Sequence, residues 1–420
     1  MTGRRILLSL VTGLALCASS ALAQPKEVVI GSVYPLSGPA ALTGLENKIA
    51  NEIARDIANG VVDVPLPLYQ RLKGMPGLKG AKVRAVFADH QGKPEVGQAE
   101  AERLITQEKV HALEGAWHSS VTATVSQVAE RHGIPHVNGQ SSSPGLTKRG
   151  FKWFFRTSPH DEHFTQTMFD FFRDFQKKRG VTLKTLGITN EDTLFGADSA
   201  KVQRELAKKY GYEVVADMQY RARATSLQAE IQRLKAANPD VWLPTSYHTD
   251  AILFVRQSKE LDYNPKMVMA QNAGHQSPDF LQAVGKDAEG TMSRSPFNTD
   301  LIDRRPAAQA IARIYKERTG KDFYDNPART FTGMITLLDA INRAGSTDPE
   351  AIRKALVATN IPGDQLVMTW DGVKFDETGQ NVHVKGIIVQ LQGEKWYTVY
   401  PFDIATKEVL YPIPAWKDRK

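Results

Sequence analysis

The chain has 420 residues, a single cysteine, 41% hydrophobic residues and a formal net charge of +7 at pH 7. Its length indicates two domains rather than one, since a single hydrophobic core rarely grows beyond about 250–300 residues. A lone cysteine excludes a disulfide framework. The basic residues are scattered among acidic ones, which argues against a nucleic-acid-binding surface.

The first 23 residues have the pattern of a cleaved export signal. Arg4 and Arg5 precede a mostly apolar run over residues 6–16, and Ala21-Leu22-Ala23 forms a small-residue cleavage site. The apolar run is too short to cross a membrane, and no second one follows. We therefore expect a secreted protein that does not itself span the membrane. Cleavage would also remove the cysteine and two arginines, which lowers the net charge to +5.

Beyond residue 27, strand-like apolar runs alternate with amphipathic helical ones. In the first part, the predicted strands are 28–33, 82–88, 111–115 and 135–138, separated by helices 45–59, 94–109 and 121–132. After residue 155 the rhythm restarts, with helices 164–178, 197–210, 227–237 and 250–261 and strands 185–189, 213–219, 241–244 and 266–270. Such alternation predicts parallel sheets covered by helices on both faces. Two runs of similar length indicate two similar α/β lobes.

The rest of the chain departs from this rhythm. Two more helices are predicted at 307–319 and 330–344, and the tail has the pattern of antiparallel strands at 367–370, 384–392 and 396–400. Segment 60–80 carries three prolines and several glycines, so we expect a surface excursion near the first lobe. No flexible linker separates the lobes, which should therefore join through short structured crossings.

Polar and aromatic side chains follow the predicted strands, where open parallel sheets bind their ligands. Ser119 and Ser120 stand at the start of a predicted helix, whose free backbone N–H groups suit a ligand carboxylate or carbonyl group. Helix capping is the plainer interpretation of those serines. A second serine cluster, at positions 141–143, follows the next predicted strand and favours a polar ligand site. The candidate ligand-binding residues are Trp117, Ser119, Ser120, Gln140, Ser141, Ser142, Phe195, Tyr247 and Asn272.

Four segments resemble the branched-chain amino acid type (leucine/isoleucine/valine-binding-like) of periplasmic substrate-binding proteins of ABC transporters. They read VVIGSVYPLSGPAALTG at 28–44, FADHQGKPEVGQAEAERLI at 87–105, GLTKRGFKWFFRT at 145–157 and GKDAEGTM at 285–292. The resemblance implies a type I periplasmic binding protein fold, with two lobes joined by a three-crossover hinge. It places residues 24–160 and 290–382 in the N-terminal lobe and residues 161–289 and 383–420 in the C-terminal lobe.

The same resemblance suggests roles for individual residues. Ser119 lies where the family binds a ligand carboxylate, and Ser141 and Ser142 lie where it binds the polar head. Phe195 and Tyr247 lie where the family often carries tyrosines. Asn272 departs from the pattern, because amino-acid-binding members often carry a carboxylate there for the ligand's ammonium group. We therefore expect a small amino acid or related carboxylate or amide, with an aromatic acid as the alternative.

Other functions receive less support from the sequence. No nucleophile elbow, Walker loop, dinucleotide fingerprint or zincin motif is present, so we expect neither an enzyme nor a cofactor. His160-Asp161-Glu162-His163 is a dense group of possible metal ligands, but its position before a helix favours capping over metal binding. We expect a monomer that delivers its ligand to ABC transporter permease subunits. A sensor that uses the same clamp, and a secreted hydrolase, remain alternatives.

Overall fold

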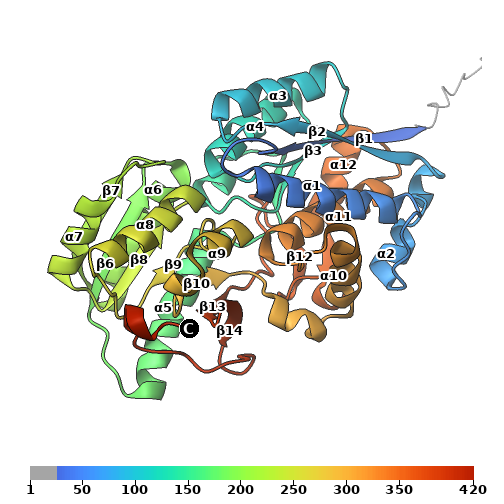
Figure 1. Cartoon of the computed structure of the whole chain (residues 1–420). Helices are drawn as coiled ribbons and strands as arrows, with labels where there is room; N and C mark the ends of the chain where they lie inside the picture. The colour runs from blue at the N-terminus through green and yellow to red at the C-terminus, as the bar shows by residue number, and fades with distance from the viewer. Residues whose placement is uncertain (1–25) are drawn as a thin grey trace, which may run out of the picture.

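The computed structural model describes residues 26–420, which form two lobes (Figure 1). The predicted export signal lies outside the described residues. Most of the predicted helices and strands occur within a few residues of their expected bounds. The prediction of an α/β fold with two helix-flanked lobes is confirmed.

The first lobe is built on a five-stranded parallel sheet with the order β2-β1-β3-β4-β5. Seven of the eight residues of the interior strand β1 are buried, because helices cover both faces of the sheet. The strands are β1 (Glu27–Tyr34), β2 (Lys82–Asp89), β3 (Ala112–Gly115), β4 (His136–Asn138) and β5 (Phe154–Arg156).

Helices α1 and α11 pack together and share the largest hydrophobic cluster with the sheet, whereas α3 and α4 cover the opposite face. Helix α11 is buried along nearly its whole length, so it forms the centre of this lobe. The helices of the lobe are α1 (Ala41–Ala58), α2 (Pro67–Leu72), α3 (Pro94–Thr106), α4 (Ser119–His132), α10 (Pro306–Thr319), α11 (Asp325–Ala344) and α12 (Pro349–Val357).

The second lobe contains a parallel three-stranded sheet, β7-β6-β8, and a mixed four-stranded sheet, β14-β13-β10-β9. A parallel bridge between Trp242 and Val268 joins the two sheets at the edges of β8 and β9. The strands are β6 (Thr185–Glu191), β7 (Glu213–Tyr220), β8 (Val241–Thr245), β9 (Met269–Ala270), β10 (Met292–Ser295), β13 (Ile387–Gln392) and β14 (Lys395–Tyr400). The antiparallel pairing of β13 with β14 agrees with the predicted tail.

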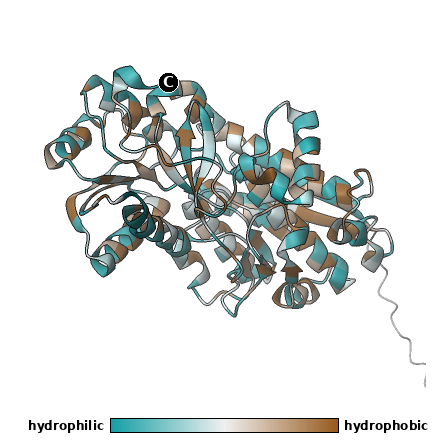
Figure 2. Cartoon of the chain, turned by 90° about the horizontal axis from the view of Figure 1, so that it is seen from below, coloured by the Kyte–Doolittle hydropathy of each residue, from teal (hydrophilic) through white to brown (hydrophobic). Residues whose placement is uncertain are grey.

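One face of the second sheet packs on α5 and α6, and the other packs on α7 and α8. Helix α5 carries five buried phenylalanines, at positions 164, 169, 171, 172 and 175. In Figure 2 the outer helices carry both hydrophilic and hydrophobic stretches, as amphipathic helices do. The helices are α5 (Asp161–Arg179), α6 (Leu194–Tyr210), α7 (Gln228–Ala237), α8 (His248–Glu260) and α9 (Pro278–Val284).

The chain passes between the lobes three times, after β5, after β10 and after β12 (Gly372–Lys374), which pairs with β11 (Asn360–Pro362). The second crossing lies after Ser295 rather than at the expected residue 290, because β10 pairs with β9 and β13 of the second lobe.

Segment 60–80 lies largely at the surface of the first lobe, as expected, but six of its side chains are buried in the hydrophobic core cluster of that lobe. Pro67 begins the short helix α2, whose Tyr69 is buried and stacks on Phe331 of α11 with ring centroids 6.1 Å apart. The backbone N–H of Gly77 donates to the side chain of Asn342 at 2.9 Å. These contacts anchor the segment to the first lobe.

The strand predicted at 367–370 is also wrong. These residues form no strand, and Val367, Met368 and Trp370 are instead buried side chains of the first lobe's core. A short apolar run has the same appearance whether it forms a strand or an irregular core segment, so periodicity could not distinguish the two.

Candidate functional site

The carboxyl ends of the strands in the two lobes face each other, and two cavities lie between them. The cavity that we call the inner chamber has a volume of about 270 Å³ and is lined mostly by buried residues. Its lining comprises Trp117, Ser119, Gln140, Ser142, Phe195, Tyr247, Ala273, Arg294 and Arg329. Six of the nine candidate residues thus come together here, from both lobes.

An aromatic cluster spans the two lobes beside the inner chamber. The ring of Tyr247, which precedes α8, lies 4.9 Å from Trp117 and 5.3 Å from Phe195 between centroids. His248 stacks on Trp117 at 5.3 Å with an interplanar angle of 18°. Flat apolar walls of this kind suit a planar or apolar ligand body.

Ser119 is the first residue of α4, and its side chain is buried in the wall of the inner chamber. The residue that caps this helix is His118, whose side chain makes no capping hydrogen bond. Capping therefore does not account for Ser119. The hydroxyl group and the positive end of a 14-residue helix point to an anionic or carbonyl ligand group.

Within the second serine cluster, Ser141 and Ser142 have different surroundings. Ser142 lines the inner chamber, whereas the Ser141 hydroxyl is hydrogen-bonded to Thr122 at 2.6 Å and to backbone carbonyls, and it does not line the chamber. Gln140 donates from its amide to Thr330 at 2.7 Å, and its Oε1 is buried with no hydrogen-bond partner among the described residues. That oxygen is a free acceptor for a ligand donor.

Asn272 lies behind the chamber wall rather than in it. It adopts a left-handed conformation with φ of 61°, and its amide donates to Asp325 of the first lobe at 3.0 Å. The neighbouring Ala273 takes the place in the lining. Asn272 therefore does not line the inner chamber, and its side chain links the two lobes.

Arg294 is a lining residue that the sequence analysis missed. It extends from β10, stacks on the Phe164 ring at 3.8 Å and donates to Ser142 at 3.3 Å and to Asp161 at 3.2 Å. Burial lowers the pKa of Arg294 to about 10, so its guanidinium group stays charged at neutral pH. Burial also raises the pKa of Asp161, against the effect of the nearby Arg294.

Arg329 of α11 is the second missed residue. Its Nη2 donates to Asp325 at 2.6 Å, while its Nε is buried with no partner among the described residues. Neither arginine could be found from a local sequence pattern, because Arg294 lies in a short strand of the second lobe and Arg329 in a helix of the first.

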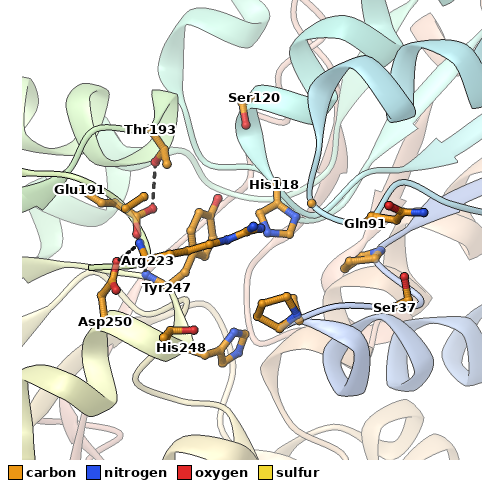
Figure 3. A pocket seen from close by; sticks show the side chains of 16 residues that line it. Ser37, Gln91, His118, Ser120, Glu191, Thr193, Arg223, Tyr247, His248 and Asp250 are labelled. Atoms are coloured by element: carbon orange, nitrogen blue, oxygen red, sulfur yellow. Dashed lines mark hydrogen bonds between the residues drawn. The ribbon is translucent and has the colours of Figure 1, made fainter. Parts of the chain in front are cut away.

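The second cavity, which we call the outer chamber, has a volume of about 600 Å³ and includes exposed residues such as Ser37 and Gln91 (Figure 3). Ser120 lines this chamber, and Tyr247 borders both. Figure 3 shows Arg223 reaching across it from the second lobe toward His118 of the first.

Several titratable groups in the outer chamber are held neutral. Glu191 accepts hydrogen bonds from Thr193 at 2.8 Å and from the backbone of Tyr247 at 3.1 Å, and burial raises its pKa to about 8. Burial lowers the pKa of His248 to about 4 and that of His118 well below its usual value. Glu191, His118 and His248 are therefore uncharged near neutral pH.

No group of three or more residues suited to metal binding occurs among residues 26–420. His160 and His163 form a capping box at the start of α5, in agreement with the capping interpretation. A search of the same residues for helices long and apolar enough to cross a membrane finds none.

A sequence profile of the periplasmic binding protein family matches residues 27–401. The Leu/Ile/Val-binding protein homolog 7 of Brucella suis biovar 1 (strain 1330) is 29% identical over 405 residues, which cover 95% of this chain and 97% of that protein. The chain belongs to the periplasmic binding protein family. The resemblance to its branched-chain amino acid type is confirmed.

Solved structures support the same fold. The branched-chain amino acid transporter substrate binding protein LivJ of Streptococcus pneumoniae, in complex with isoleucine, superposes with a TM-score of 0.75 at 20% identity, covering 92% of this chain and 100% of that one. An ABC transporter solute binding protein of R. palustris, in complex with benzoate, gives a TM-score of 0.75 at 16% identity, covering 93% and 98%. The fold thus accommodates ligands of different chemistry.

Proposed function

We propose that this periplasmic binding protein captures a small organic carboxylate that lacks an ammonium group and carries a flat or apolar body. The observation that carries this proposal is the charge of the inner chamber, whose lining includes two arginines and no carboxylate. The nearby carboxylates of Asp161 and Asp325 are paired with those same arginines.

An amino acid is the alternative ligand, and its ammonium group decides between the two. Burying an ammonium group without a carboxylate partner costs roughly 2–5 kcal/mol. Asp192 and Asp250, two carboxylates of the second lobe, accept hydrogen bonds from backbone N–H groups of their own lobe. The relatives include both an isoleucine complex and a benzoate complex, so the fold itself favours neither ligand.

Matched ligand pairs test the proposal directly. Titration calorimetry would compare 3-phenylpropionate with phenylalanine, and 4-methylpentanoate with leucine, because each pair differs only in the amino group. We expect the acid of at least one pair to bind at least about tenfold more tightly than its amino acid. Tighter binding of the amino acid in both pairs would overturn the proposal.

We further propose that the protein acts in the periplasm as a monomer without catalytic activity and delivers its ligand to the permease subunits of an ABC transporter. Family membership supports this role. In proteoliposomes that contain the transporter, the loaded protein should stimulate ATP hydrolysis, and the ligand should be recovered unchanged. Binding to a receptor domain without stimulation would favour the sensor function instead.

A further inference from the structure

A third cavity lies inside the second lobe and shares no lining residue with the two chambers. We call it the tail cavity, because the C-terminal residues Ile413, Trp416 and Arg419 form one of its walls. Its volume is about 400 Å³, and its other walls include Trp242 and Phe254. Most of the lining side chains are apolar, as in cavities that hold small organic molecules.

The C-terminal wall is fixed by specific contacts. The guanidinium group of Arg419 lies 3.5 Å from the centroid of the Trp416 ring and donates to the carbonyl of Pro414 at 3.2 Å and to the side chain of Asn264. Upstream, the N–H of Ile413 donates to the carbonyl of Lys266 at 3.0 Å. The wall is therefore held by the lobe itself rather than resting loosely against it.

Two polar atoms at this cavity lack partners among the described residues. Ser258 is only 2% exposed, and its hydroxyl has no hydrogen-bond partner. The indole N–H of Trp416 is also buried without a partner. Buried polar groups are almost always hydrogen-bonded, so two unpaired ones beside a cavity indicate a missing polar partner.

We propose that the tail cavity is a second binding site, distinct from the clamp between the lobes, for a small, mostly apolar molecule that carries one hydroxyl group. The oxygen of such a hydroxyl can accept from the Trp416 N–H, and its proton can be donated to the Ser258 hydroxyl. The aromatic and aliphatic walls then cover the rest of the molecule. The site does not depend on the ligand proposed for the inner chamber.

Phenol is a suitable probe, with toluene as the matched molecule that lacks the hydroxyl. Calorimetry on the purified protein should detect phenol binding, and toluene should bind more weakly. Ser258→Ala should weaken phenol binding roughly three- to tenfold through loss of one hydrogen bond. Val255→Phe, which fills the cavity from α8, should abolish it.

Tyr247→Ala is the control that separates this cavity from the clamp, because Tyr247 lines both chambers and lies outside the tail cavity. Phenol affinity should be the same in this variant as in the parent protein. If Tyr247→Ala abolishes phenol binding, or if Ser258→Ala leaves the affinity unchanged, the tail cavity is not the site. The Ser258→Ala comparison still decides the matter if Val255→Phe fails to fold.

Discussion

The ring centroids of Trp117 and Tyr247 lie 4.9 Å apart at an interplanar angle of 45°, although the two residues belong to different lobes. Ser119 of the first lobe and Tyr247 of the second both line the inner chamber. Ser119 and Tyr247 therefore line facing walls of one chamber. A ligand held between these walls contacts both lobes, which is how binding can shift a hinge toward its closed state.

Trp117→Ala should weaken binding of the preferred carboxylate by about 2 kcal/mol, or roughly thirtyfold, because it removes the largest flat wall of the inner chamber. Calorimetry measures the change. Trp153→Ala is the matched control, since Trp153 lies in the same lobe but outside both chambers. An equal loss of affinity in both variants would mean that general destabilisation, not the wall, is responsible.

Arg294→Lys should weaken carboxylate binding by about 2 kcal/mol while the protein still folds. Lysine keeps the positive charge opposite Asp161, but it cannot stack flat on Phe164 or donate to several acceptors at once. Binding of 3-phenylpropionate would be compared with binding of its neutral amide, 3-phenylpropionamide.

The amide should lose much less affinity than the acid if Arg294 pairs with the ligand's charge. Arg353→Lys serves as the control, because Arg353 is an arginine of α12 that stacks on Trp153 away from the chambers. A similar loss for acid and amide would assign Arg294 a purely structural role in the wall.

Glu191 should make the protein less stable as the pH rises. Its usual pKa of 4.5 is raised by burial to about 8 in the folded protein. Below about pH 4.5 the group is protonated in both the folded and unfolded states, so burial of its charge costs nothing. Between 4.5 and 8 the folded state must keep a proton that the unfolded state releases, and the free energy of unfolding falls accordingly.

Glu191→Gln removes this titration while keeping the shape of the neutral group. Urea unfolding at pH 5, 6.5 and 8 would give the free energy of unfolding for both proteins. The buried histidines, which oppose folding as the pH falls, are present in both proteins and cancel in the difference. The advantage of the glutamine variant should grow steadily with pH, and a constant difference would show that Glu191 does not titrate in this range.

Much of the fold could be predicted from the sequence, because the alternating strands and helices each have a local pattern of apolar residues. The burial of β1 and the two faces of each sheet followed from those patterns. The strand predicted at residues 367–370 was wrong, and the anchoring of segment 60–80 was missed, because both depend on packing against distant partners such as Phe331 of α11. The amino-acid composition of a segment does not indicate which distant residues it contacts.

The candidate site likewise contains some residues that could be predicted from the sequence and others that could not. Residues at strand ends, such as Ser119 and Tyr247, could be predicted because parallel sheets bring their carboxyl ends together. Arg294 and Arg329 reach the inner chamber from β10 and α11, which the chain contributes only after it has crossed between lobes. Their position depends on how the lobes face each other, which no periodicity reveals.

Ser119 and Ser141 provide the sharpest comparison within the site, since the two serines differ in role although both are buried. Ser119→Ala should weaken ligand binding by about 1–3 kcal/mol and leave stability nearly unchanged, because its hydroxyl has no hydrogen bond within the described part of the chain. Ser141→Ala should instead lower the free energy of unfolding by about 1–2 kcal/mol, because it breaks the bond to Thr122. Calorimetry and urea unfolding of both variants separate the two effects. If Ser119→Ala binds the ligand as tightly as the parent protein, the start of α4 does not contact the ligand, and the carboxylate must be held by the arginines alone.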